Sequence, residues 1–369
     1  MSLIEATYLA TRPDRDPAEL AENIAREQSL EILDELIPDD IRASLLGRVL
    51  GVAPVDEDRW LLRIGYPEAL ASAQMGQLLQ LLHGNVTFYP RIRLQAVDLP
   101  RSVIEELPGP IGGIPEIRAQ LGVPSRPLLL TVLKPRGSRP EILAQLAGRF
   151  ARGGGDLLKD DQNLVERSIE AFQARVSACA AAVQDAQQHS GKACLYLPHV
   201  AGSGDWLRRQ LAVVKELGLP GVVLCPWVMG LESAATAARE FELMWLAHPA
   251  GAGVYTEAPE NGIDSSLIFG TLPRLAGADL SIFPGSGGRI SLGEPGSESA
   301  IVEALTGALG RHAATLPCSG GGKTLDRAPE AAAALGGNCA IVVGGDLLRA
   351  RSRLEAVTRD TIARLEAMD

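Results

Sequence analysis

Residues 128–135 read LLLTVLKP and residues 156–161 read DLLKDD, two apolar runs that each end near charged side chains. Six more runs of this kind follow: CLYLPHV (194–200), GVVLCPW (221–227), LMWLAHPA (243–250), DLSIFPG (279–285), TLPCSGG (315–321) and AIVVGGD (340–346). Near-continuous apolar runs predict parallel strands that are covered on both faces. Amphipathic stretches such as DWLRRQLAVVKELG (205–218) separate them. Eight such units in about 240 residues favour a closed (β/α)8 barrel over the alternative, a doubly wound open sheet.

The amino-terminal part of the chain predicts a smaller domain of another kind. Its segments follow the order β-α-β-β-α-β: ATYLATR (6–12), PAELAENIAREQSLE (17–31), the two strands in RVLGVAPVDEDRWLLRIGYP (48–67), LASAQMGQLLQLLHG (70–84) and VTFYPRIRLQAVDLP (86–100). This order is typical of a small α+β sandwich. The Gly- and Pro-rich segment GPIGGIPEIR (109–118) is interpreted as a linker. We therefore expect an α+β domain over residues 1–115 and the barrel over residues 116–369.

Composition excludes several classes of partner. The formal net charge of −10 argues against nucleic acid as the main partner. The chain has no run of about 18 apolar residues, so we expect no membrane span. Its five cysteines lack the spacing of a zinc site, and its amino terminus lacks a secretory pattern. These features predict a cytoplasmic protein.

The reactive side chains of the predicted barrel lie at the ends of its strands, which meet on one face. In KDD (159–161), alternation along the strand sends Lys159 and Asp161 to one side and Asp160 to the other. A lysine beside a carboxylate is a salt bridge, a proton-transfer base or part of a metal site, and the pattern leaves all three open. Lys134 ends an otherwise apolar strand, so its ammonium must meet an anion or lose its proton.

Two glycine groups, SGGGK (319–323) and VGGD (343–346), follow the seventh and eighth predicted strands. These two loops of a barrel commonly bind phosphate through backbone N–H groups, although glycines also make plain turns. The candidate phosphate-binding residues are Ser319, Gly320, Gly321, Gly344 and Gly345, with Lys323 and Arg289 as candidate cations. His248 is a candidate for catalysis, and His199 has no assigned role.

The motifs RPLLLTVLKPRG, GGGDLLKDDQNL, YLPHVAG, CSGGG and VVGGD, in this order and spacing, resemble the large subunit of ribulose-bisphosphate carboxylase (RuBisCO). The resemblance covers nearly the whole chain, because AREQS (25–29) and HGNV (83–86) are similar to that family's substrate-contacting N-terminal segments. It implies a ferredoxin-like α+β N-terminal domain followed by a (β/α)8 TIM barrel that carries the active site. It also implies a homodimer in which Glu27 and Asn85 reach the neighbouring subunit's active site.

The resemblance assigns roles to the residues that match the family's motifs. Lys134 matches the lysine that handles the enediolate, and Lys159 matches the lysine that carbon dioxide carbamylates to bind Mg²⁺. Asp161 matches one carboxylate ligand, whereas Gln162 stands at the other ligand position. This exchange removes a negative charge and implies weaker Mg²⁺ binding, although an amide oxygen can still coordinate. With His248, which keeps a family histidine, the catalytic candidates are Lys134, Lys159 and His248.

Other positions depart from the family. Arg136 replaces a second lysine, and Pro249 replaces the arginine that grips phosphate. Phe283 stands in place of the sixth strand's histidine. The following loop, GSGGRISLGEP (285–295), lacks the lysine that stabilises the carboxylated intermediate, and Arg289 is its nearest cation. This pattern resembles the RuBisCO-like proteins, which do not fix carbon.

The retained groups imply that a phosphorylated sugar is enolised, with a metal that polarises its oxygens. Without the phosphate-gripping arginine, a substrate with one phosphate and a less polar end against Phe283 fits best. The main expectation is therefore isomerisation of 5-methylthioribulose 1-phosphate. One alternative is decarboxylation or carboxyl transfer on a branched 3-oxo sugar acid, with Arg136 or Arg289 on the carboxylate. The others are a 2,3-diketo-5-methylthiopentyl-1-phosphate enolase and a non-catalytic sugar-phosphate sensor; joint retention of Lys134 and Lys159 argues against the sensor.

Overall fold

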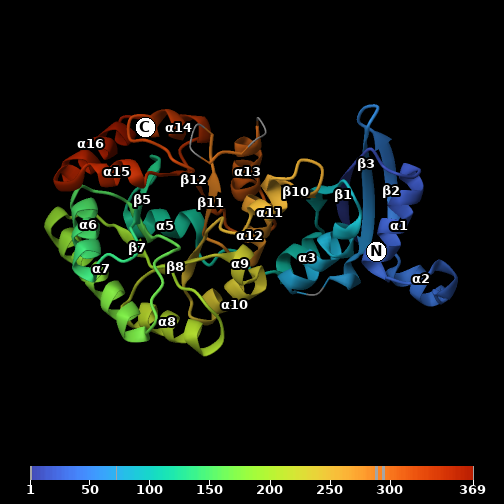
Figure 1. The fold of residues 1–369 in the computed structure, drawn as a ribbon, viewed down its shortest axis with the longest axis horizontal. Helices are drawn as coiled ribbons and strands as arrows, with labels where there is room; N and C mark the ends of the chain where they lie inside the picture. Colours follow the sequence, from blue (N-terminus) through green and yellow to red (C-terminus); the bar gives the residue numbers. More distant parts are fainter. Residues whose placement is uncertain (1, 72, 287–289, 293–295, 369) are drawn as a thin grey trace.

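The computed structural model describes residues 2–71, 73–286, 290–292 and 296–368. Its larger part is an eight-stranded parallel barrel, drawn from green to red in Figure 1. The strands are β5 (Leu128–Leu133), β6 (Leu157–Asp160), β7 (Leu195–Leu197), β8 (Gly221–Leu224), β9 (Met244–Ala247), β11 (Leu280–Pro284), β12 (Leu316–Gly320) and β13 (Ala340–Val342). All eight lie within the runs that the sequence predicts, so the strand prediction is confirmed.

The barrel closes, which excludes the open-sheet alternative. The strand order β7-β6-β5-β13-β12-β11-β9-β8 brings its two end strands together. There Val223 N–H donates to the Pro198 carbonyl at 2.8 Å, and Val200 N–H donates to the Val223 carbonyl at 3.2 Å. The helices around it include α6 (Pro140–Arg152), α7 (Ile169–Ser190), α8 (Gly204–Glu216), α10 (Leu231–Glu240), α12 (Leu272–Ala276), α13 (Ser297–Thr306), α14 (Ala328–Leu335) and α16 (Leu354–Glu366).

The barrel interior is a packed apolar core that the short helix α5 (Gly113–Leu121) closes from below. Ile117 of α5 is fully buried and belongs to the same cluster as the inward-facing Leu128, Leu130 and Leu316. The linker interpretation of residues 109–118 was therefore wrong from Gly113 onward. A nine-residue helix is short enough to escape a sequence pattern, and the apolar floor of the barrel gives this one its packing partner.

The N-terminal domain has the predicted β-α-β-β-α-β order. Its elements are β1 (Leu3–Thr11), α1 (Pro17–Ser29), β2 (Arg48–Pro54), β3 (Arg59–Pro67), α3 (Met75–His83) and β4 (Ile92–Asp98), with the additional helices α2 (Asp39–Leu45) and α4 (Arg101–Glu106). The strand order β4-β1-β3-β2, with antiparallel pairs, is that of a ferredoxin-like sheet.

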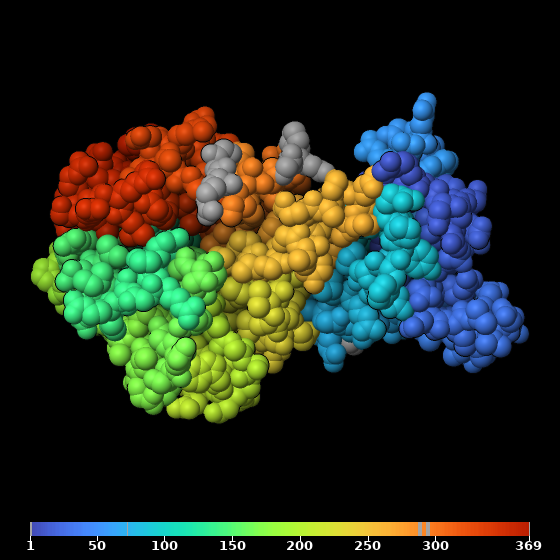
Figure 2. All heavy atoms as spheres, viewed as in Figure 1, coloured from blue at the N-terminus to red at the C-terminus, as the bar shows by residue number. Residues whose placement is uncertain are grey.

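The barrel half of the chain adds a fifth strand to this sheet. β10 (Gly262–Ile263) pairs in parallel with β4, and the buried Arg93 guanidinium donates to the carbonyls of Ala258 and Asn261. Figure 2 shows the N-terminal lobe, blue to cyan, against the gold segment that contains β10. The two halves are thus joined at this sheet edge, and also where α3 contacts α10 and α12. Among the described residues, no helix has the length and apolar character needed to cross a membrane.

We predict that Ile117→Ala lowers the free energy of unfolding by about 3 kcal/mol, because the change leaves a cavity in the barrel floor. Urea unfolding followed by circular dichroism measures the change. The exposed Gln120→Ala on the same helix is the control, with an expected change within about 0.5 kcal/mol. Equal effects of the two substitutions would show that α5 does not seal the barrel.

Candidate active site

A cavity of about 810 Å³ lies at the carboxyl ends of the barrel strands. Several predicted site residues line it together: Lys134, Lys159, Asp161, Gln162, His248, Gly320, Gly321, Gly344 and Gly345. They come from five different strands or the loops that follow them, as expected where all carboxyl ends meet. The structure therefore brings most of the predicted site into one space.

Lys159 is the most deeply buried cation at the cavity. Its side chain is only 1% exposed, and its Nζ donates to the Asp160 carbonyl oxygen at 2.6 Å. Burial lowers the pKa of Lys159 to about 8, against the opposing charges of Asp161 and Asp160. A substantial fraction of this amine is therefore neutral near pH 8, and a neutral amine can accept a proton or react with carbon dioxide.

Lys134 and Asp161 form an ion pair beside Lys159. The Lys134 Nζ lies 3.3 Å from Asp161 Oδ2, which supplies the anion that the sequence required for this lysine. Burial would raise the pKa of Asp161, but a hydrogen bond from the Asn163 backbone and the charge of Lys134 lower it. Asp161 is therefore ionised at neutral pH, and its carboxylate is available to a cation in the cavity.

Asp160 faces away from the cavity, as the alternation predicted. Its carboxylate accepts hydrogen bonds from the Tyr196 hydroxyl at 2.9 Å and the His199 backbone N–H at 3.0 Å, and it pairs with Arg175. Arg175 also binds Glu166. This buried network fixes the back of β6 against α7 and β7, and so holds the strand that presents Lys159.

His248 is a neutral imidazole at the end of β9. Burial, and then the charges of Lys159, His199 and Lys134, lower its pKa well below the usual value. Its Nδ1 accepts a hydrogen bond from the Ala250 backbone N–H at 3.2 Å, so the ring proton is on Nε2. In this tautomer His248 can donate a hydrogen bond to a substrate oxygen from Nε2.

His199 lies in the barrel wall but does not line the cavity. Its side chain is 4% exposed, and its Nε2 lies 3.7 Å from Cys225 Sγ. Burial lowers its pKa to about 4, so the ring is neutral. Nδ1 has no hydrogen-bond partner among the described residues. Because His199 does not line the cavity, it stays without an assigned role.

Other predicted site residues lie elsewhere. The Ser319 side chain is fully buried and its hydroxyl lies 3.5 Å from Glu298 Oε2, while Arg136 is exposed outside the cavity. Arg289 lies outside the described residues. In the N-terminal domain, Asn85 Nδ2 donates to Glu27 Oε1 at 3.0 Å, so these two predicted residues lie together but not at this chain's own cavity.

Phe283 of β11 is among the residues that line the cavity, beside Ile282 and Pro284. The Phe283 ring has no exposure and packs in the outer core between strands and helices, whereas Ile282 belongs to the barrel interior. Side chains alternate along β11, so adjacent residues cannot both face the barrel axis. Phe283 therefore borders the cavity from within its wall, and the expectation that a less polar substrate end lies against it stays a prediction.

The sequence analysis missed a second ion pair at the mouth. Arg349 lies 3.6 Å from Asp346, whose carboxylate also accepts the Leu325 backbone N–H at 2.9 Å. Both charged residues line the cavity. The only sequence signal was the i, i+3 spacing directly after the VGGD run, which is common on helix surfaces.

The residues at the cavity fit a divalent metal ion if Lys159 carries a carbamate. Among the described residues, no group of three or more His, Cys, Asp and Glu side chains is arranged to hold a metal. The KDDQ segment offers the cavity one carboxylate, from Asp161, and one amide, from Gln162. Mg²⁺ is held by oxygen ligands that usually include carboxylates. A carbamate on Lys159 would add the second anionic group, and the donor set would then fit.

A ferredoxin-like domain followed by a closed barrel, with a buried lysine and a carboxylate at its mouth, defines the RuBisCO class of proteins. Residues 113–347 match the family described as ribulose bisphosphate carboxylase large chain, catalytic domain. This chain belongs to that family, among its RuBisCO-like proteins.

Similar proteins extend over almost the whole chain. Ribulose bisphosphate carboxylase-like protein 1 of Rhodopseudomonas palustris is 40% identical over 95% of this chain and 94% of its own. The 5-methylthioribulose-1-phosphate isomerase of Rhodospirillum rubrum is 34% identical over 98% and 95%. A crystal structure of a Rubisco-like protein from Rhodopseudomonas palustris, 33% identical, superposes with a TM-score of 0.89 over 99% of this chain and 98% of that one.

We predict that Lys159 forms a carbamate whose yield rises as the pH increases from about 7 to about 9, because only the neutral amine reacts with carbon dioxide and its pKa is about 8. Carbon-13 NMR with labelled bicarbonate detects the adduct. Lys159→Met should remove the signal. Asp161→Asn should shift the rise to lower pH, since it removes a charge that favours the ammonium form. The same signal in Lys159→Met would place the carbamate at another amine.

Proposed function

We propose that this protein isomerises 5-methylthioribulose 1-phosphate by proton transfer at the carbons next to the carbonyl. The observation that carries the proposal is the buried Lys159 amine, with a pKa of about 8, beside the Lys134 ammonium and the neutral His248. The named activity of the relative from Rhodospirillum rubrum, which matches 98% of the chain, supports the same reaction.

The proposal gives each of the three groups a task. Lys159, as its amine or as the carbamate formed from it, takes the proton from carbon. Lys134 stabilises the negative oxygen of the enediolate, because its ammonium is held at the cavity by Asp161. His248 donates a hydrogen bond from Nε2 to a substrate oxygen. The proton then returns to the neighbouring carbon, so the reaction needs no oxidant or other co-reactant.

Mg²⁺ would be held by carbamylated Lys159, Asp161 and Gln162. When bound, it polarises the carbonyl and hydroxyl oxygens and makes the α-proton more acidic. Because Gln162 is uncharged, we expect weaker Mg²⁺ binding than at a site with two carboxylates and a carbamate.

The walls of the cavity support a substrate with one phosphate. Gly320, Gly321, Gly344 and Gly345 line one part and offer backbone N–H groups without side chains in the way. Pro249, Ala250 and Ala252 line another part, together with Ile282. A small apolar wall suits a methylthio group and offers no cation to a second phosphate.

The alternatives make different demands on the same cavity. A branched 3-oxo sugar acid needs a cation for its carboxylate. Arg136 lies outside the cavity, but Lys323 and Arg349 line it, so measured turnover decides between this alternative and the isomerase. The 2,3-diketo enolase reaction needs the same proton transfer, so only a comparison of substrates separates it from the isomerase. A sensor would not need a lysine with a lowered pKa at its binding site.

We predict that the purified protein converts 5-methylthioribulose 1-phosphate into an isomeric pentulose phosphate and incorporates deuterium at carbon in D₂O, as followed by proton and phosphorus NMR. Lys159→Met should lower kcat by at least about 1,000-fold, because it removes the proton acceptor. The exposed Lys215→Met is the control and should keep full activity. Turnover of only the 2,3-diketo phosphate or of the 3-oxo sugar acids would replace the isomerase with that alternative.

We also propose that the protein is a homodimer with active sites shared between subunits. Asn85 and Glu27 are joined to each other but do not line this chain's own cavity. Three residues after Asn85, the Phe88 side chain is 87% exposed, which is unusual for an unpaired phenyl ring beside a polar pair. A second copy that covers this corner would bury Phe88 and bring Asn85 to the partner's cavity.

Mixed dimers test this arrangement. Asn85→Ala and Lys159→Met proteins should each be inactive alone, but a refolded equimolar mixture should recover about a quarter of the sites, since half of the dimers are mixed and each has one intact site. Activity per protomer and light scattering measure the outcome. A mixture as inactive as its components, in proteins that do dimerise, would mean that Asn85 does not serve the partner's site.

A further inference from the structure

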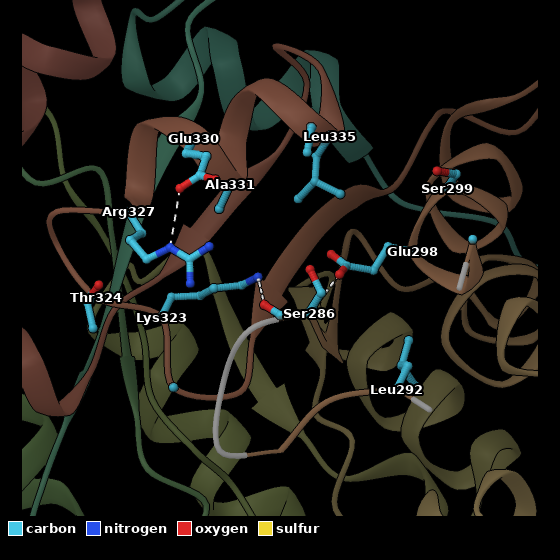
Figure 3. A pocket seen from close by; sticks show the side chains of 13 residues that line it. Ser286, Leu292, Glu298, Ser299, Lys323, Thr324, Arg327, Glu330, Ala331 and Leu335 are labelled. Carbon is cyan, nitrogen blue, oxygen red and sulfur yellow. Dashed lines mark hydrogen bonds and ion pairs between the residues drawn. The ribbon is translucent and has the colours of Figure 1, made fainter. Parts of the chain in front are cut away.

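A second cavity, of about 590 Å³, lies behind the glycine loop that follows β12. It shares Gly322, Lys323 and Thr324 with the active-site cavity. The segment after β11, the first turn of α13 and one side of α14 along its length contribute much of the remaining wall (Figure 3). A ligand in this second cavity would therefore touch residues that also border the active site.

At this cavity, two side chains of opposite charge form hydrogen bonds with the backbone of Ser286. Lys323 Nζ donates to the Ser286 carbonyl oxygen at 2.6 Å, and the Ser286 backbone N–H donates to Glu298 Oε1. In Figure 3 the two side chains reach Ser286 from opposite sides. The ammonium and the carboxylate are thus separated by the backbone of a single amino acid, from its N–H to its carbonyl oxygen.

Within the described part of the chain, both charged groups keep unused hydrogen-bonding capacity. Lys323 is only 9% exposed, and its ammonium has three N–H donors, one of which binds Ser286. Glu298 accepts the Ser286 N–H and a long contact of 3.5 Å from Ser319, although a carboxylate can accept about four hydrogen bonds. The nearby Arg327 and Glu330 neutralise each other at 3.2 Å, so neither adds an uncompensated charge.

The rest of the wall includes an apolar strip on α14. Ala331, Ala334 and Leu335 lie there with spacings of three and four residues, on one face of the helix. The cavity therefore has a polar end, formed by the Lys323 ammonium and the Glu298 carboxylate, and an apolar wall on α14 that borders open space.

We propose that this second cavity binds a free α-amino acid with an aliphatic side chain. Its carboxylate would bind Lys323 and its ammonium would bind Glu298. The Ser286 backbone is oriented in the same way, with its carbonyl oxygen toward Lys323 and its N–H toward Glu298. The side chain would pack on Ala334 and Leu335. A zwitterion supplies one charge of each sign, whereas a phosphate or a simple carboxylate would meet Lys323 but offer no positive group to Glu298. Because Lys323 borders both cavities, the bound amino acid changes substrate affinity; this second effect rests on the proposed function.

Calorimetric titration of the full-length protein with L-leucine tests the site without any turnover. We expect saturable binding, and we expect 4-methylpentanoate and 3-methylbutylamine to bind at least about tenfold more weakly, because each lacks one of the two charges. Ala334→Leu should abolish leucine binding by filling the apolar wall, and Glu298→Gln and Lys323→Met should weaken it about tenfold. Arg359→Gln, on the exposed face of α16, is the matched control and should bind as the unchanged protein does.

Three results would overturn the proposal: no saturable binding of leucine up to about 10 mM, equal binding of leucine and 4-methylpentanoate, or leucine binding that Ala334→Leu leaves unchanged. Ala334 is exposed and makes no polar side-chain contact, so we expect Ala334→Leu to fold. This variant therefore tests the binding site even if Lys323→Met does not fold. Leucine should also change the KM for 5-methylthioribulose 1-phosphate at least twofold. If leucine binds but the KM does not change, only the proposed effect of leucine on substrate affinity is overturned. If the protein has no isomerase activity, the leucine-binding result still stands.

Discussion

Every second side chain of a barrel strand must point toward the axis, and this alternation decides which residues reach the active-site cavity. It sends Lys159 and Asp161 inward from β6 while Asp160 turns outward to Arg175. The same strand therefore supplies both the reactive pair and the buried anchor behind it. On β11, Ile282 belongs to the barrel interior and the neighbouring Phe283 packs in the outer core, although both border the cavity.

The closed barrel also sets the chemistry of Lys159. The apolar interior lies directly below this residue, and the Asp160 carbonyl is the hydrogen-bond acceptor of its amine. Desolvation therefore outweighs the attraction of two nearby carboxylates and lowers the pKa of Lys159 to about 8. The same lysine in solvent would be an ammonium that neither accepts a proton nor reacts with carbon dioxide. At the more exposed end of the cavity, Lys134 forms an ion pair with Asp161.

The glycine loop after β12 has a packing role beside its proposed role with phosphate. A Cβ on Gly285 would lie 2.1 Å from Ser319 Oγ, and a Cβ on Gly321, whose φ is +95°, would lie 2.1 Å from the Ile290 carbonyl oxygen. Glycine at these positions lets the end of β11 lie directly against the loop. Lys323 then bridges the two segments through Ser286, and this bridge forms part of the wall between the two cavities.

The sequence by itself determined the eight barrel strands, because continuous apolar runs are a local property of the chain, and alternation correctly divided Lys159 from Asp160. Only the tertiary structure decided which way the Phe283 side chain points, since a register difference of one residue moves a side chain to the other face of a strand. The two-residue strand at Gly262 has no sequence signal of its own, and only pairing with β4 creates it. Likewise, α5 is a buried helix and not a linker, because Ile117 finds its apolar partner only at the floor of the finished barrel.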